Sequence, residues 1–322
     1  MNTPRLRISL PKSAKQAQAT FDSPLPDRDM TAALSLPECF VVKKTEKVVL
    51  PIESVVEREF VIENQEQVSE PIEEAAADKE KIGWLSPRYT ISRSVTLDLA
   101  KLEANRCVAI NPQALELDAY RVLRTQLLQR TREGGGNTIL VTSALPGEGK
   151  TLTAINLAIT FAREFQQTVL LVDCDLKRQM VHEYLGYESD CGVIDFLLND
   201  RPVSELMTWP GIEKLTIISG GRNLTESSEL LGCVRMRELV HDLRSRYPER
   251  YVIFDLPSVL EGADALAFAP FVDHVVMTVR EGKTPIQDIN RAIGMLPADK
   301  LLGLVMNRHT GGLPAASRKR PK

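Results

Sequence analysis

The chain has 322 residues, enough for one large or two ordinary domains, and 43% of them are hydrophobic, which is sufficient for a buried core. Its formal net charge of −3 gives no argument for nucleic acid, and we expect no nucleic-acid partner. Five scattered cysteines without a Cys-x-x-Cys pair suggest neither a disulfide framework nor a zinc site, a pattern typical of cytosolic proteins. No apolar run is long enough to cross a bilayer, so membrane contact is expected to be peripheral or through a partner.

Residues 1–82 are expected to be a disordered or linker region. Prolines recur there, and the stretch from Glu53 to Glu80 is acidic with little periodicity. Short strand-like pieces such as Cys39–Val42 are expected to pair locally at most. Residues 83–111 carry a mildly amphipathic helical pattern, which favours packing on the core over docking to a partner. Residues 311–322 are expected to be a flexible basic tail.

A helix is predicted over 116–132, because leucines and Tyr120 recur on one face. Asp118, Arg121 and Arg124 follow one another at three-residue spacing, which predicts a charged strip along one side of this helix. Three consecutive glycines, 134–136, end it.

Residues 138–151, TILVTSALPGEGKT, combine an apolar strand, a flexible turn and a Lys-Thr pair that opens a helix. In a phosphate-binding loop, glycines let backbone N–H groups face phosphate oxygens, a lysine reaches the β- and γ-phosphates, and a hydroxyl ligates Mg²⁺. The usual first glycine is here Ala144, which is small enough for that position. An ordinary strand-turn-helix corner is the disfavoured alternative. The predicted nucleotide-binding residues are Pro146, Gly147, Glu148, Gly149, Lys150, Thr151 and Leu152.

Two further apolar strands end in acidic residues. The strand 168–173 ends in Asp173, and Asp175 follows two residues later. The strand 251–255 ends in Asp255, which is the Walker B pattern. Ligands bind beyond the carboxyl ends of parallel strands, so Lys150 and these three aspartates are the candidate catalytic residues. Thr151, Asp175 and Asp255 are the candidate Mg²⁺ ligands. The alternative is that the carboxylates are merely solvated charges at strand ends.

The rest of the chain alternates between strands and helices. Strands are expected over 215–219, 274–279 and 301–306, and helices over 193–198, 234–247 and 285–296. This alternation predicts an α/β fold with a doubly wound, mainly parallel sheet and helices on both faces, a P-loop NTPase over residues 112–310. The guanine-selecting Asn-Lys-x-Asp is missing, since 307–310 reads Asn-Arg-His-Thr, so ATP with Mg²⁺ is the expected cofactor.

Residues 143–151, 170–178 and 252–257 together resemble the bacterial tyrosine kinases, within the MinD/ParA-like P-loop ATPases. The resemblance implies that Asp118, Arg121 and Arg124 lie on an oligomerisation helix that reaches a neighbouring subunit in a ring, and that Asn307 touches adenine. Glu229–Leu231 and Thr284-Pro285 are similar to further family segments. Leu256 and Ser258 depart from the family, which commonly has Thr and Pro there.

The implied setting is capsule or exopolysaccharide synthesis and export. The implied partners are a membrane polysaccharide chain-length determinant (copolymerase) protein, other copies of the chain, and tyrosine-containing protein substrates. The protein is then expected to be cytoplasmic and held peripherally at the inner face of the membrane through that partner. Asp173 is expected to orient or deprotonate the acceptor hydroxyl.

Two features separate kinase from ATPase interpretations. Leu145 stands where partition-type relatives place a second lysine, which favours the kinase branch. No tyrosine follows Met306, although the family usually ends in a tyrosine-rich tail. The chain is therefore expected either to phosphorylate another protein or another of its own tyrosines, such as Tyr89, or to act as a non-kinase ATPase switch of the MinD/ParA type. A structural adaptor without catalysis is disfavoured, because all expected ligands are present.

Overall fold

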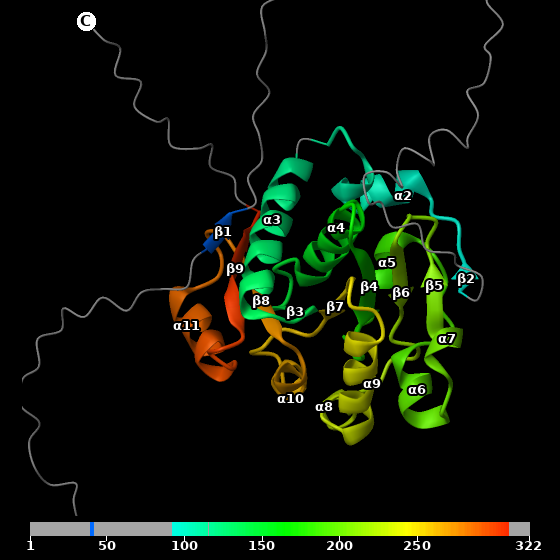
Figure 1. Ribbon diagram of the computed structural model, residues 1–322. Helices are drawn as coiled ribbons and strands as arrows, with labels where there is room; N and C mark the ends of the chain where they lie inside the picture. The colour runs from blue at the N-terminus through cyan, green and yellow to red at the C-terminus, as the bar shows by residue number, and fades with distance from the viewer. Residues whose placement is uncertain (1–38, 42–91, 115, 309–322) are drawn as a thin grey trace, which may run out of the picture. The chain divides into compact units, whose positions relative to one another are not determined.

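The structure is a computed structural model that describes residues 39–41, 92–114 and 116–308 (Figure 1). The predictions for most of the N-terminal linker, for Tyr89 and for the 311–322 tail lie outside these residues. All described residues belong to one compact unit. Among them, no helix combines the length and the apolar character needed to cross a membrane.

The described residues form one sheet of nine strands in the order β1-β9-β8-β3-β7-β4-β6-β5-β2. Every neighbouring pair is parallel except β5 and β6, so the predicted mainly parallel sheet is confirmed. The strands are β1 (Cys39–Val41), β2 (Arg93–Ser94), β3 (Thr138–Ser143), β4 (Thr168–Asp173), β5 (Met207–Trp209), β6 (Leu215–Ile218), β7 (Arg250–Asp255), β8 (His274–Arg280) and β9 (Leu301–Asn307).

Helices cover both faces of the sheet (Figure 1). The first face carries α2 (Leu99–Ala104), the 3₁₀ helix η2 (Val108–Ile110), α3 (Leu117–Gly134), α4 (Lys150–Ala162) and α5 (Val181–Leu185). The second face carries α6 (Val193–Asn199), α7 (Val203–Leu206), α8 (Ser227–Leu231), α9 (Val234–Ser245), α10 (Asp264–Phe268), the 3₁₀ helix η3 (Ala269–Phe271) and α11 (Ile286–Met295). Two separate hydrophobic clusters result, one on each side of the sheet.

The central elements are apolar because they are covered on both sides. All residues of β3 and β4 are buried, which explains why their sequences are continuous apolar runs instead of alternating ones. All but two of the 13 residues of α4 are buried as well. The strand and helix that flank the predicted phosphate loop therefore form the middle of the domain.

Three short strands were not assigned correctly by the sequence patterns. Within the piece Cys39–Val42, expected to pair only locally, residues 39–41 form the edge strand β1, which pairs in parallel with β9. β5 and β2 have only three and two residues, too few for a period to show. Such strands depend on a partner distant in sequence, which local patterns do not contain.

In the segment 92–111, the leucine pattern is only partly a core pattern. Leu102 of α2 is fully buried, whereas Leu99 is 67% exposed. The segment contributes to the same hydrophobic cluster as α3 and α4. The proposed boundary at residue 112 stays a prediction.

We predict that Phe254→Ala, in the centre of β7, lowers the free energy of unfolding by about 3–5 kcal/mol, because it leaves a cavity in the core. Phe254 is fully buried and its ring centroid lies 4.9 Å from that of Phe268. Urea unfolding measures the change. Leu198→Ala, at a side chain that is 46% exposed, is the control and is expected to cost less than about 1 kcal/mol. Equal losses in both variants would contradict this packing.

Candidate nucleotide-binding site

The predicted site residues meet at the carboxyl ends of three adjacent strands, β3, β7 and β4. Asp255 is in register with Val141 of β3 on one side and with Asp173 of β4 on the other. The loop after β3 leads into α4, whose first residue is Lys150. The sheet order thus brings together segments that lie more than a hundred residues apart in the sequence.

The phosphate-binding loop depends on glycine at its last position. Gly149 has a φ of 95°, a left-handed conformation that other residues adopt only at a cost. A Cβ atom there would lie 2.1 Å from Nδ2 of Asn307. Immediately after Gly149, the first amides of α4 lack intrahelical acceptors and, with the helix dipole, favour an anion at this point.

Lys150 faces the carboxylates at the strand ends. Its Nζ lies 2.6 Å from Oδ2 of Asp175, 3.9 Å from Oδ1 of Asp255 and 3.2 Å from the hydroxyl of Thr151. Burial lowers the pKa of Lys150, but the Asp255 and Asp175 carboxylates outweigh that effect and raise it. The lysine is therefore a fixed positive charge at the end of the loop.

Asp255 is fully buried, and neither of its oxygens accepts a hydrogen bond from a residue that the structure describes. Burial raises its pKa to about 6, against the opposing effects of Lys150 and of the nearby Thr151 hydroxyl. A buried carboxylate that accepts no hydrogen bond, with its cation Lys150 as far as 3.9 Å away, is costly, so it indicates a position built for a further cation or a donor.

Asp173 lies deeper than the sequence pattern suggested. It is fully buried, and its two oxygens accept hydrogen bonds from the backbone amides of Asp175 and Val181, each at 3.1 Å. Burial, and then the Asp255 carboxylate, raise its pKa well above the usual range. In this geometry Asp173 shapes the loop that carries Asp175, and its role at an acceptor hydroxyl stays a prediction.

Glu148 points into the protein instead of toward a ligand. Its side chain is buried, with Oε2 accepting the amide of Leu145 at 2.9 Å and Oε1 accepting the hydroxyl of Thr284. The carboxylate thereby closes the loop on itself and ties it to the segment between β8 and α11. Sequence reasoning missed this role, although the family-like Thr284-Pro285 was a signal for it.

Three other residues predicted to bind the nucleotide, Asn307, Leu152 and Pro146, differ in their contacts and burial. The Nδ2 of Asn307 donates to the carbonyl of Glu148 at 2.8 Å, so this amide group supports the loop, and its contact with adenine stays a prediction. The side chain of Leu152 packs against the core, which leaves its backbone amide for a ligand. Pro146 is exposed on the outer bend of the loop.

The departures after the Walker B aspartate have structural explanations. Ser258 accepts a hydrogen bond from the Ser143 hydroxyl at 3.0 Å, and the Thr142 hydroxyl donates to the Pro257 carbonyl at 2.6 Å. Leu256 is fully buried in the core. The segment after β7 is thus fastened to the start of the phosphate loop.

The three predicted oligomerisation residues on α3 do not all point the same way. Asp118 and Arg121 form an exposed ion pair at 2.8 Å. Arg124 instead turns toward the end of α4, donating to the Thr160 carbonyl at 3.1 Å and lying 3.2 Å from the Glu164 carboxylate. Only the first two are therefore presented outward.

The residues fit a nucleotide-bound Mg²⁺ better than a metal held by protein alone. Within the described ranges, no three or more His, Cys, Asp or Glu side chains gather into a metal-binding group. Mg²⁺ commonly takes one or two carboxylates and fills its shell with phosphate oxygens and water. Asp255 with its free oxygens, Asp175 and the Thr151 hydroxyl supply such a donor set.

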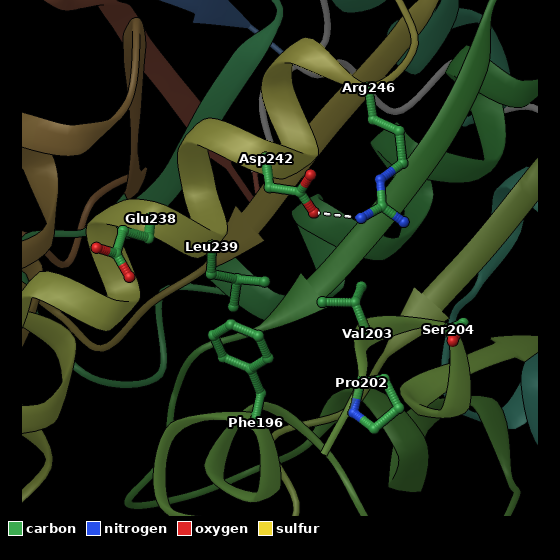
Figure 2. A pocket seen from close by; sticks show the side chains of 8 residues that line it. All are labelled: Phe196, Pro202, Val203, Ser204, Glu238, Leu239, Asp242 and Arg246. Carbon is green, nitrogen blue, oxygen red and sulfur yellow. Dashed lines mark hydrogen bonds and ion pairs between the residues drawn. The ribbon is translucent and has the colours of Figure 1, made fainter. Parts of the chain in front are cut away.

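Another concave surface of the described residues lies away from the P-loop. A groove of about 410 Å³ separates α6 and α7 from α9, and Figure 2 shows Phe196, Val203 and Leu239 pointing into it. At its rim, Arg246 pairs with Asp242 at 2.5 Å. None of the predicted nucleotide ligands lines this groove.

Comparison with known proteins agrees with this geometry. A family model described as the CobQ/CobB/MinD/ParA nucleotide binding domain matches residues 139–315, more than half of the chain. The tyrosine-protein kinase YwqD of Bacillus subtilis is 31% identical over 210 residues, which cover 65% of this chain and 87% of that protein. The chain belongs to the bacterial tyrosine-kinase branch of this nucleotide-binding family.

Some relatives of the chain are much longer. The succinoglycan biosynthesis transport protein ExoP of Rhizobium meliloti is 27% identical over 215 residues, which cover 63% of this chain but only 26% of ExoP. The kinase domain of the Escherichia coli tyrosine kinase ETK has the same fold, with a TM-score of 0.59 and 23% identity over 73% of this chain and 95% of that domain.

We predict that Asp255 makes folding less favourable as the pH rises from about 4 to about 6. Its pKa is about 6 in the folded protein but near 3.8 when unfolded, so between these values the folded chain holds the extra proton. Urea unfolding in metal-free buffer at several pH values measures this for the wild type and Asp255→Asn. The wild type should lose about 2 kcal/mol relative to the variant across this window. A constant difference would contradict the raised pKa.

We predict that Thr284→Val destabilises the protein by about 1–3 kcal/mol, because it removes the hydroxyl that donates to the buried Glu148 carboxylate and accepts from the Arg280 amide. Thr284→Ser keeps the hydroxyl and should stay close to the wild type. Denaturant unfolding measures both variants. Equal stability of the Val and Ser variants would show that this hydrogen bond does not hold the loop.

Proposed function

We propose that this protein is a Mg²⁺- and ATP-dependent protein-tyrosine kinase. The observation that carries the proposal is the position of the Lys150 ammonium, at the start of α4, against Asp175 and Asp255. The Bacillus subtilis relative YwqD is a tyrosine-protein kinase by name, which supports phosphoryl transfer to tyrosine.

The proposed roles follow from charge and position. Lys150 and the amides of the loop neutralise the phosphates, while Thr151, Asp175 and Asp255 hold Mg²⁺ and Asn307 contacts the base. Asp173 orients or deprotonates the acceptor hydroxyl. When bound, Mg²⁺ supplies charge neutralisation at the transferring phosphoryl group. Catalysis of this kind is mainly positioning and electrostatic stabilisation, for which these side chains suffice.

We place the activity in polysaccharide synthesis and export, since ExoP is named for succinoglycan biosynthesis and transport. In this proposal the protein is cytoplasmic and reaches the inner face of the membrane through a polysaccharide chain-length determinant protein. The exposed Asp118–Arg121 pair on α3 contributes to a homo-oligomeric ring. Tyrosine-containing proteins serve as acceptors.

A second candidate function is an ATPase switch that assembles and recruits partners without tyrosine phosphorylation. It is supported by the family model that matches residues 139–315, which is named for MinD and ParA. The two functions share the same nucleotide site. They differ in whether the γ-phosphoryl group is transferred to a phenol or to water.

We predict that Lys150→Met lowers both ATP turnover and phosphotyrosine formation at least about a hundredfold, because it removes the charge that stabilises the transferring phosphoryl group. Purified protein with Mg²⁺-ATP and a glutamate–tyrosine copolymer is assayed for ADP release and phosphotyrosine. Lys283→Met, at an exposed lysine beyond β8, is the matched control and should retain activity. Turnover of ATP that depends on Lys150 but yields no phosphotyrosine would favour the switch. Unchanged turnover in Lys150→Met would refute both functions.

A further inference from the structure

The structure sorts the tyrosines of the described part by accessibility. Tyr120, Tyr187 and Tyr251 are buried, and burial raises the pKa of Tyr120 to about 12. Tyr184 is partly buried against the core. Tyr247 is 41% exposed, more than any other tyrosine in residues 92–114 and 116–308.

The hydroxyls of two of the buried tyrosines, Tyr187 and Tyr251, also form hydrogen bonds. Tyr187 shares a hydrogen bond with the Ser219 hydroxyl at 2.9 Å, and Tyr251 with the Thr131 hydroxyl at 2.8 Å. A phosphoryl group on either oxygen would have to break the bond and open the core. These side chains are therefore poor acceptors for a kinase acting on folded protein.

Tyr247 lies in a basic turn between α9 and β7. The guanidinium of Arg250 stands over its ring, 4.1 Å from the centroid, and the turn is closed by a 3.1 Å hydrogen bond from the Arg250 amide to the Tyr247 carbonyl. Arg244 and Arg246 precede it at the end of α9, with side chains 47% and 39% exposed. The ring thus stacks against a cation while the side chain stays partly exposed to solvent.

The surface beside this turn can receive an anion. A hollow of about 540 Å³ beside it is lined by Ser245 and Pro248, which are close to Tyr247 in sequence, and by Arg132, His241 and Arg244. Arg244 also forms an ion pair with Asp273 at 2.9 Å, and a phosphate would compete with that carboxylate. Phosphotyrosine is a strong acceptor of charge-assisted hydrogen bonds from arginine. The phosphorylated form would therefore be stabilised at this turn.

Resting on the proposed kinase function, we propose that Tyr247 is a phosphorylation site and that another copy of this chain modifies it. The phenolic oxygen of Tyr247 forms the new bond to the γ-phosphorus of ATP. The bond between that phosphorus and the β,γ-bridging oxygen breaks, ADP leaves, and the phenolic proton passes to a base of the donor copy and then to solvent.

The topology requires two copies for this transfer. Tyr247 comes before the first residue of β7, whereas Asp255 is its last residue and lies beside Lys150. Six residues at about 3.3 Å each place the two ends of the strand on the order of 15–20 Å apart. Reacting atoms must approach to about 3–3.5 Å, so one chain does not reach its own Tyr247.

Phosphorylation also has a defined local consequence. A phosphate near −2 in charge competes with carboxylates for arginine. Arg246, the residue before Tyr247, forms such a pair with Asp242 at the rim of the groove between α9 and α6–α7 (Figure 2). Loss of this pair would change the charge at one end of that groove.

The test mixes two variants of the whole chain, one that can only accept the phosphoryl group at Tyr247 and one that can only donate it. Lys150→Met, labelled with ¹⁵N, is the inactive acceptor with Tyr247 intact. Unlabelled Tyr247→Phe is the active donor without the acceptor hydroxyl. After mixing with Mg²⁺-ATP, mass spectrometry should find phosphate on the ¹⁵N-labelled Tyr247 peptide, and none when the acceptor is incubated alone.

Controls separate this inference from the kinase function on which it rests. Tyr184→Phe should keep Tyr247 phosphorylation, and Tyr247→Phe should keep ATP turnover and labelling of a glutamate–tyrosine copolymer. Phosphotyrosine on the copolymer, or on another tyrosine of the chain, without any on Tyr247 would overturn the inference and leave the kinase function standing. ATP turnover without phosphotyrosine on the copolymer or on any tyrosine of the chain would overturn both the Tyr247 inference and the kinase function.

Discussion

The site depends on one electrostatic arrangement, the Lys150 ammonium held against the carboxylates of Asp175 and Asp255. Charges in this position have lost most of their water, and each is tolerable only because the other is present. The strand order β3-β7-β4 enforces the arrangement, because it puts the ends of these strands next to one another. The order of the strands in the sheet thus fixes which charged side chains of the site lie next to one another.

The phosphate loop is shaped from outside as much as by its own sequence. Thr284, before α11, binds Glu148, and Asn307, at the end of β9, binds the carbonyl of the same residue. On the opposite side, Ser258 after β7 meets Ser143. Three segments from different parts of the chain therefore hold a loop that would otherwise be among the most mobile parts of the fold.

The sequence was sufficient for the central elements and insufficient for their supports. β3, α4, β4 and β7 were predictable because apolar runs and glycine spacing are local signals. The inward turn of Glu148 was not, because it depends on Thr284, which is 136 positions away. Arg124 likewise shares the spacing of Asp118 and Arg121 but turns to α4, since the neighbour that attracts it, Glu164, lies on another element. Chemistry was readable from residue types, whereas side-chain direction required the tertiary structure.

The bond from Asn307 to the phosphate loop links that loop to the border of the sheet. β9 pairs with β8 on one side, while on the other side, within the part of the chain that the structure describes, the three residues of β1 pair with it. Strands near a border open locally at a lower free energy than the centre of a sheet. Local opening of β9 would therefore release the hydrogen bond from Asn307 to the Glu148 carbonyl without global unfolding. Ligand affinity in the middle of the domain is in this way coupled to the integrity of its edge.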